Sequence, residues 1–336
     1  MDATRSPGPH VNAQPLESWA NEIVERHGLR RRDELRRTTH DLSDRLRNLI
    51  WEVEHEGRPA VLKVYDDDVV NVEAESLRAF HDSNRSEVLR APELFLFEVV
   101  SLTRGWLLIE KLPDDGRFLE SPLRRDERRR FVELFGDYRR NFPRGANRPL
   151  ALAEAQDAYR FYSYRTMQAL ETASSREQQR AFAGERTVLE HGELLPRLEA
   201  AMDLLRALFR RRQLHWGHGH FKPADLFEYS DGRFAITDFG HTKMLPEGFE
   251  EAMAIWWDQM IIGESQTYGD WRSEIDAWGQ EFLAADTELD SSRLWGAVLE
   301  RALANVLETI ALDDDMAAAE RRNRLEFHYR LIDDLT

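Results

Sequence analysis

Two short segments decide the fold, HGHFKPADLF at residues 218–227 and ITDFG at residues 236–240. They set Asp225 and Asp238 on either side of a short hairpin, with His220 just ahead of both. Carboxylates so placed can hold a divalent cation against phosphate oxygens, while a neighbouring side chain accepts the proton of an attacking hydroxyl. The two segments therefore indicate a phosphoryl-transfer site. An imidazole, that of His220, stands where a carboxylate is expected to accept the proton.

The composition is that of a globular chain. Its 336 residues are 42% hydrophobic and 32% charged, which suits two domains or one two-lobed domain with a sizeable core. The net charge of -16 argues against nucleic acid or an anionic membrane surface as the main partner. The chain has no cysteine, so disulfides are excluded and any metal must be held by oxygen and imidazole ligands. No signal peptide and no run of about 18 apolar residues is present, so we expect a cytoplasmic protein.

The first third of the chain predicts a small sheet with a helix inserted in it. Residues 1–16 are rich in Pro, Gly and polar residues and predict a disordered tail. Apolar residues at helical spacing then predict a short helix from about Leu16, and the basic residues Arg30–Arg32 predict solvated surface. The remaining pattern predicts strands at 49–54, 60–65, 94–100 and 106–110, with Lys63 in the second strand and a helix over 70–82.

The rest of the chain predicts helices, with strands too sparse for a second sheet. Pro, Asp and Gly make residues 113–118 the boundary between the two parts. A turn at 230–232 joins two short strands, 226–229 and 233–237. The helices are expected near 121–140, 151–172, 176–212, 247–262, 268–284, 291–310 and 315–333.

This arrangement resembles the protein-kinase-like superfamily, particularly the aminoglycoside phosphotransferase and choline kinase branch, over about residues 45–265. The family has a metal-binding Asn five residues after its catalytic Asp and a metal-binding Asp thirteen residues further on, and His220, Asp225 and Asp238 keep both intervals. Lys222-Pro223 and the Asp-Phe-Gly triplet at 238–240 also match. The resemblance implies an α+β, two-lobed fold: a disordered tail at 1–16, a small antiparallel β N-lobe at 17–112, a hinge at 113–118 and a mainly helical C-lobe at 119–336.

The resemblance also implies a nucleotide site that binds ATP. Lys63 matches the strand lysine that pairs with the α- and β-phosphates, and Glu73 is the first choice for the helix carboxylate that holds it, with Glu75 as the alternative. No glycine-rich motif occurs near residues 43–52, so Ser43 and nearby amides are expected to cover the phosphates, as is usual for the small-molecule branch. The positions of Glu110 and Leu112 match the hinge that offers backbone groups to adenine.

Asp238 and Asp225 match the residues that bind Mg²⁺ in the family. Asp225 replaces the usual Asn, and the added negative charge favours strong dependence on Mg²⁺ or Mn²⁺. Two structural alternatives stay open at this point. Asp225 could cap a turn, and Asp238 could bond to loop amides.

His220 and Lys222 match the catalytic residues of the family, and three functions remain open for them. A neutral imidazole can act as a base near neutral pH, so an active phosphotransferase is one hypothesis. A protonated His220 would place a positive charge where the family has a negative one, so a nucleotide-binding pseudokinase with a regulatory or scaffold role is the second. The third is a histidine-based zinc protein, whose ligands would come from His215, His218, His220 and His241.

A small-molecule hydroxyl compound is the expected substrate. Acidic residues after the Asp-Phe-Gly triplet could attract a cationic amino sugar or amino alcohol, although solvated helix faces explain them equally. These residues are Glu247, Glu250, Glu251, Asp270, Glu274 and Asp276. Asp258 resembles the helix Asp that braces the catalytic loop of the family, and the alternative is a solvent-facing Asp beside two core tryptophans.

Overall fold

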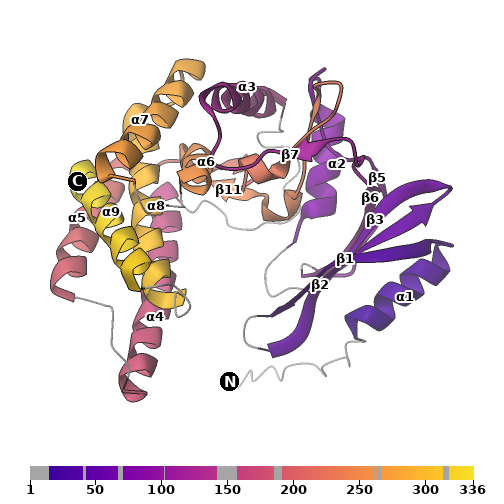
Figure 1. Ribbon diagram of the computed structural model, residues 1–336, viewed down its shortest axis with the longest axis horizontal. Coiled ribbons are helices and arrows are strands. Elements are labelled where there is room, and N and C mark those ends of the chain that lie inside the picture. The colour runs from indigo at the N-terminus through magenta and orange to yellow at the C-terminus, as the bar shows by residue number, and fades with distance from the viewer. Residues whose placement is uncertain are drawn as a thin grey trace, which may run out of the picture. The chain divides into compact units, whose positions relative to one another are not determined.

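The structure is a computed structural model, shown in Figure 1. It describes residues 15–40, 43–66, 71–101, 103–141, 157–184, 191–259, 262, 266–312 and 318–336. The chain divides into two compact units. The first contains the residues up to Arg78 and Ala91–Asp115, and the second contains Ala79–Arg90 and Gly116–Thr336. Among the described residues, no helix is both long and apolar enough to cross a membrane.

The first unit is built on a five-stranded antiparallel sheet with strand order β1-β2-β3-β6-β5. A helix precedes the sheet, and another begins in this unit and ends in the second. The two strand pairs predicted around 49–65 and 94–110 are confirmed. The elements are α1 (Leu16–Arg26), β1 (Arg30–His40), β2 (Ser43–His55), β3 (Arg58–Asp66), α2 (Glu73–Ser83), β5 (Leu94–Val99) and β6 (Arg104–Glu110).

The edge strand β1 is missing from the sequence prediction. Its Arg30–Arg32 segment is exposed, as expected, but it also pairs with β2. The strand carries charged residues in place of an apolar alternation, because cross-strand polar contacts hold it. Arg30 forms an ion pair with Glu54 at 3.0 Å, and the Arg31 guanidinium lies 3.8 Å from the Trp51 ring centroid. Charged side chains are typical of edge strands. A prediction based on hydrophobic alternation therefore finds no signal for this strand.

The second unit is mainly helical, and α8 contacts α4, α5, α6 and α9. The predicted break between helices at 172–176 is wrong, since α4 continues through it. Thr172 fits inside the helix because its hydroxyl donates to the carbonyl of Gln168, 3.0 Å away. The helices are α3 (Arg125–Asn141), α4 (Ala158–Phe182), α5 (His191–Phe209), α6 (Phe249–Gln259), α7 (Tyr268–Ala285), α8 (Ser291–Leu312) and α9 (Ala318–Leu335).

The second unit also contains two small sheets, which corrects the expectation that its strands are too sparse for a sheet. One has four strands in the order β4-β10-β9-β7, and the other pairs β8 with β11. The hairpin predicted at 226–229 and 233–237 is confirmed as β9 and β10, whereas the other four strands have only two or three residues each, too short for a periodic signal in the sequence. The strands are β4 (Leu89–Arg90), β7 (Arg117–Phe118), β8 (His215–Gly217), β9 (Leu226–Glu228), β10 (Phe234–Ile236) and β11 (Lys243–Leu245). Two short 3₁₀ turns, η1 (Pro223–Asp225) and η2 (Phe239–His241), carry the motif residues.

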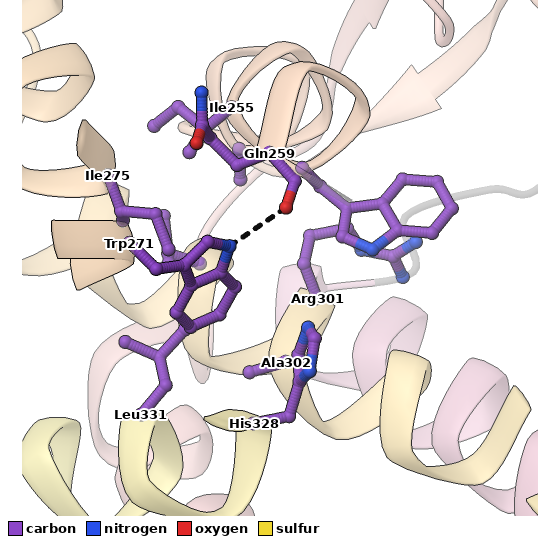
Figure 2. Close-up of a pocket in the computed structure, with 11 residues that line it drawn as sticks. Ile255, Gln259, Trp271, Ile275, Arg301, Ala302, His328 and Leu331 are labelled. Carbon is purple, nitrogen blue, oxygen red and sulfur yellow. Dashed lines mark hydrogen bonds between the residues drawn. The ribbon is translucent and has the colours of Figure 1, made fainter. Parts of the chain in front are cut away.

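Helices α6, α7, α8 and α9 of the second unit meet around Trp271. Figure 2 shows the side chains that lie between them. The indole nitrogen of Trp271 donates a hydrogen bond to the backbone oxygen of Gln259, at 2.9 Å. The side chains line a cavity of about 20 Å³, room for roughly one water. His328 of α9 lies among them and is 2% exposed. The core here is closely packed and contains a buried titratable group.

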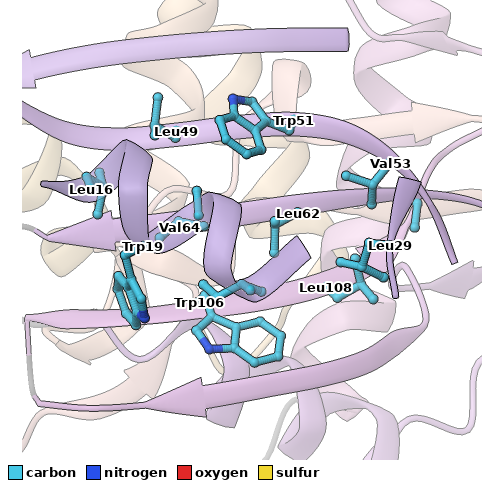
Figure 3. Close-up of a cluster of buried hydrophobic side chains, with 13 residues drawn as sticks. Leu16, Trp19, Leu29, Leu49, Trp51, Val53, Leu62, Val64, Trp106 and Leu108 are labelled. Carbon is cyan, nitrogen blue, oxygen red and sulfur yellow. The ribbon is translucent and has the colours of Figure 1, made fainter. Parts of the chain in front are cut away.

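The core of the first unit lies between α1 and one face of the sheet, as Figure 3 shows. Strand residues alternate between the two faces of a sheet, so every second residue points toward α1. In β3 the residues in this core are Ala60, Leu62 and Val64. Lys63 therefore lies on the opposite face. The alternation of the apolar residues thus sets the direction in which the ammonium points.

Candidate active site

Lys63 is held by a carboxylate in the first unit. It lies within β3, between Ile50 of β2 and Leu107 of β6. Its ammonium donates to the carboxylate of Glu73, and the two side chains are only 16% and 6% exposed. Glu73 is the first residue of α2, and its backbone N–H donates to Asn71 Oδ1 at 3.0 Å. Of the two candidates left open by the sequence, Glu73 pairs with the lysine.

In the second unit, a fully buried histidine holds the loop before η1. His218 follows β8, and its Nε2 lies 2.9 Å from the carbonyl oxygen of Thr237. Burial lowers the pKa of His218 to about 4, so the ring is neutral near pH 7 and Nε2 donates this bond. The ring also packs edge-on against Phe239. His218 therefore has a structural role beneath the Asp-Phe-Gly segment.

Gly219 brings the two motif segments into direct contact. Its φ angle is 84°, in the left-handed region that favours glycine. A Cβ at this position would lie 2.2 Å from the carbonyl oxygen of His241. The register of β8 and β11, with Gly217 opposite Lys243, leads to the same juxtaposition. Only glycine allows the loop and η2 to approach this closely.

Lys222 lies between His220 and Asp225. Its ammonium donates to Asp225 Oδ1 at 2.6 Å and lies 3.2 Å from Nδ1 of His220. Burial, with the nearby His241 and Lys222, lowers the pKa of His220 to about 2. The imidazole is therefore neutral, and Nδ1 accepts from the ammonium.

The two motif aspartates are in different environments. Asp225 is 5% exposed, and burial raises its pKa to about 7 despite the neighbouring Lys222. Its Oδ2 has no hydrogen-bond partner among the described residues, and its Oδ1 accepts from the Lys222 ammonium. Asp238 has a left-handed φ of 61°, uncommon for a residue other than glycine, and its side chain is 37% exposed. One carboxylate is thus poorly solvated, and the other is accessible.

His220, Asp238 and His241 come together at the end of the two segments. One possible ligand atom from each lies within 4.8 Å of the other two. The centroids of the imidazole rings are 4.1 Å apart, and His241 Nε2 lies 3.6 Å from Asp238 Oδ2. The zinc hypothesis named both histidines but not the aspartate. His218 and His215, the other two histidines of that hypothesis, lie outside this group.

Glu250 braces the loop, a role that the sequence prediction missed. It is fully buried at the start of α6 and accepts a hydrogen bond from the Gly219 N–H at 3.0 Å. It also accepts from the Tyr138 hydroxyl at 3.2 Å and pairs with Arg139 at 3.0 Å. The Tyr138 oxygen in turn accepts from the His218 N–H at 2.6 Å. No short-range sequence pattern links these residues, since the contacts join segments more than 30 positions apart.

The other acidic residues suggested for substrate attraction also have structural partners. Glu251 is 2% exposed and pairs with Arg139, so neither it nor Glu250 is a solvated charge. The remaining four bind nearby groups: Glu247 binds Arg293, Glu274 binds Arg128, Asp276 binds Arg272, and Asp270 forms the capping box of α7.

Asp258 is a buried brace, not a solvent-facing residue. It is 3% exposed and accepts hydrogen bonds from the Leu123 N–H at 2.8 Å and the Trp278 indole at 2.8 Å. These contacts tie α6 to α7 and to the segment before α3. The solvent-facing alternative is wrong, and the groups that Asp258 binds lie outside the predicted catalytic loop, residues 218–227.

The remaining sequence candidates lie at strand ends of the first unit. Ser43 begins β2, but its side chain lies outside the described residues, as do Asp41 and Leu42. Glu110 ends β6, and its N–H donates to the carbonyl of Glu93 at 2.9 Å. Leu112 follows in the segment leading out of the unit and is partly exposed. An adenine contact at Glu110 would therefore use its carbonyl group.

Comparison with known proteins identifies the fold. No protein-family model matches the chain, and no curated protein matches its sequence. Solved structures do match. Aminoglycoside phosphotransferase APH(4)-Ia is 12% identical with a TM-score of 0.56, over 95% of this chain and 97% of that one. Choline kinase LicA from Streptococcus pneumoniae is 10% identical with a TM-score of 0.55, over 96% and 100%.

A further similar structure is spectinomycin phosphotransferase APH(9)-Ia, in complex with ADP and spectinomycin. It is 10% identical with a TM-score of 0.54, over 96% of this chain and 99% of that one. At this level of identity the likeness shows the fold. The predicted fold class is confirmed: the small antiparallel sheet is the N-lobe and the mainly helical unit the C-lobe of a protein-kinase-like fold.

Proposed function

We propose that this chain, which has the fold of the aminoglycoside phosphotransferases and choline kinase, is a nucleotide-dependent phosphotransferase acting on a small-molecule hydroxyl. The Lys63–Glu73 ion pair carries this proposal. A buried lysine needs a partner, and a strand lysine held by a helix carboxylate is what kinases use to bind the α- and β-phosphates of ATP. Several solved neighbours hold ADP or an ATP analogue, which supports a nucleotide as the donor here.

Asp225 and Asp238 of the second unit are suited to hold the Mg²⁺ that accompanies a nucleotide. Mg²⁺ prefers oxygen ligands, and both side chains offer carboxylates. Oδ2 of Asp225 is buried and lacks a hydrogen-bond partner among the described residues, a costly state that a cation would relieve. When bound, the ion would neutralise charge on the transferred phosphoryl group. The donor set therefore fits the ion that kinases use.

His220 and Lys222 would act on the acceptor and the transferred group. We assign His220 the orientation of the acceptor hydroxyl, through a hydrogen bond to its neutral ring. The pKa of about 2 makes it a weak base, but phosphoryl transfer depends mainly on positioning and charge. Lys222 would supply positive charge near the transferred phosphoryl group, at the cost of its hydrogen bond to Asp225.

One observation favours a second function, a nucleotide-binding pseudokinase. The same low pKa leaves His220 without the proton affinity of a good general base, whose pKa lies near the working pH. The acidic residues after the Asp-Phe-Gly triplet are bound to other groups, so they do not by themselves identify a cationic substrate. The proposal therefore specifies a small-molecule hydroxyl compound.

Unfolding stability with and without ATP tests the nucleotide site. With Mg²⁺ present and ATP at about 100 times its Kd, we expect the free energy of unfolding to rise by about 2.7 kcal/mol, and EDTA to remove the gain. Asp238→Asn should lose most of the gain. Asp231→Asn, in the exposed hairpin turn, is the matched control and should keep it. An unchanged unfolding free energy for the wild type with either Mg²⁺ or Mn²⁺ would contradict the proposal.

Turnover then separates the two functions. We expect the wild type to consume ATP slowly in the presence of small-molecule alcohols and His220→Asp to do so at least about tenfold faster, since a positioned general base contributes roughly 10²–10⁴-fold. ATP binding without turnover in the wild type would replace the phosphotransferase by the pseudokinase. If only His220→Asp then turned over ATP, the histidine at position 220 would be identified as the reason that the wild type does not.

A further inference from the structure

We propose that His220, Asp238 and His241 bind a first-row transition ion of the Zn²⁺ class. Two imidazoles and one carboxylate each offer a ligand atom within 4.8 Å of the other two. His220 and Asp238 are partly buried, and His241 is exposed, so the group can be reached from solvent. The Asp225 and Asp238 carboxylates suit Mg²⁺, whereas the combination of Asp238 with two imidazoles favours a transition ion, so the Asp238 carboxylate could serve either ion.

The position of the three side chains follows from the backbone around them. β8 and β11 pair with Gly217 opposite Lys243, so the chain just beyond each strand end runs side by side. The contact of Gly219 with the His241 carbonyl continues this juxtaposition. The edge of the His220 ring meets Trp257 of α6, with centroids 5.5 Å apart. Two ligands thus come from neighbouring backbone segments that are already packed.

The three ligand atoms, now within 4.8 Å of one another, must move closer together to hold an ion. Donor atoms around a tetrahedral Zn²⁺ lie about 3.3 Å apart, given metal–ligand distances of about 2.0–2.1 Å. His241 Nε2 and Asp238 Oδ2 are 3.6 Å apart, close to that value. Because the His241 side chain is 45% exposed, rotation about its bonds can bring it closer without disturbing the core.

Ligand type determines the class of ion. Imidazole nitrogen suits Zn²⁺, Co²⁺ and Ni²⁺, whereas Mg²⁺ retains water and carboxylate oxygens. Three protein ligands leave at least one coordination position for an outside group, as in catalytic zinc sites. A phosphate oxygen could take that position. This last role rests on the proposed function, whereas binding of the ion does not.

Lys222 competes with the metal. Its ammonium lies 3.2 Å from Nδ1 of His220, so it occupies a lone pair of that ring and repels a nearby cation. When the metal binds His220, the ammonium of Lys222 can stay bonded to Asp225, whose Oδ1 lies 2.6 Å away. Removal of this positive charge should therefore strengthen metal binding, an effect opposite to that of removing a ligand.

Titration of the full-length protein with Co²⁺, followed by visible absorption and by competition with Zn²⁺, tests the site. His241→Ala should weaken binding at least about 10–100-fold, since even groups that only orient a ligand contribute that much. Lys222→Met should tighten binding. His81→Ala is the matched control, because His81 is an exposed histidine on α2 and should leave the affinity unchanged. His220→Ala should match His241→Ala, and the exposed position of His241 keeps the test valid if the other variant fails to fold.

Three outcomes would overturn the proposal. One is a His241→Ala variant that binds Co²⁺ as tightly as the wild type. Another is an equal loss in His81→Ala, which would mark nonspecific binding by exposed histidines. The third is displacement of Co²⁺ by equimolar Mg²⁺. Binding of a fluorescent ATP analogue is measured on the same samples, so a failed nucleotide site and a failed metal site are distinguished.

Discussion

The position of Lys63 in its strand determines what the side chain can contact. Ala60, Leu62 and Val64 enter the core beneath α1, so Lys63 faces the other side of the sheet and meets α2. A shift of one residue in register would bury the ammonium in the apolar core and leave it without a carboxylate. Helix α2 begins at Glu73, the residue whose carboxylate pairs with Lys63. The Glu73 N–H donates to the side chain of Asn71, which caps the start of the helix.

We expect Glu73→Gln to weaken ATP binding about tenfold or more. A neutral amide loses the charged hydrogen bond that orients Lys63, and such bonds contribute about 1.5–3 kcal/mol. Fluorescence titration with an ATP analogue in Mg²⁺ measures the effect. Glu75→Gln is the matched change two positions along the same helix and should retain affinity. Equal losses in both variants would show that the charge of α2 matters and the specific pair does not.

At the scale of elements, the start of α6 holds the loop that contains Gly219, just before η1, in place. Glu250 binds the Gly219 N–H, the Tyr138 hydroxyl and the Arg139 guanidinium without any solvent exposure. Burial raises the pKa of Glu250, and the charge of Arg139 opposes that shift. The network ties α3 and α6 to the loop. The loop is therefore positioned by helices distant in sequence as well as by its own turn residues.

Glu250→Ala should destabilise the protein by about 3–5 kcal/mol. The substitution leaves Arg139 with less compensation for its buried charge, and removing one partner of a buried pair costs about this much. Urea denaturation measures the change. Glu320→Ala, at an exposed position of α9, should stay within about 0.5 kcal/mol of the wild type. A loss for Glu250→Ala no larger than this would mean that the network does not hold the fold.

At the scale of the whole molecule, buried histidines make the fold sensitive to acid. Burial lowers the pKa of His328 to about 4, from 6.5 in an unfolded chain. The unfolded state therefore takes up a proton at a higher pH than the folded state. The contribution to stability is complete above pH 6.5 and is lost as the pH falls toward 4.

His328→Gln should reduce the acid sensitivity of the fold. Between pH 7 and pH 5, the wild type should lose about 2 kcal/mol of unfolding free energy that the variant keeps, because each pKa unit corresponds to about 1.4 kcal/mol. Glutamine retains a group that can bond to Asn305, the neighbour of His328. Denaturation at several pH values gives the comparison. Parallel pH profiles for the two proteins would contradict a neutral, buried His328.

Much of the fold could be predicted from local patterns. The alternation in 49–65 and the helical period of residues 16–24 reflect contacts within one element, so they are visible in the sequence. The β9–β10 hairpin was also predicted, whereas β1 and the strands β4, β7, β8 and β11 were missed, because their pairing partners are not visible in a local pattern. Propensity is a weak guide where two or three residues form a strand only through distant pairing.

The candidate site also has a part that the sequence predicts and a part that only the structure shows. The sequence by itself determined the spacing of His220, Asp225 and Asp238 and the strand that carries Lys63, because a motif is a local order of residues. Only the tertiary structure decided that His241 joins His220 and Asp238, since that grouping depends on the pairing of β8 with β11. The tertiary structure also shows that Glu250, for which the sequence favoured a solvated helix face, is buried and supports the loop through the Gly219 N–H. Burial and proximity arise when separate segments pack together, and no single segment carries that information.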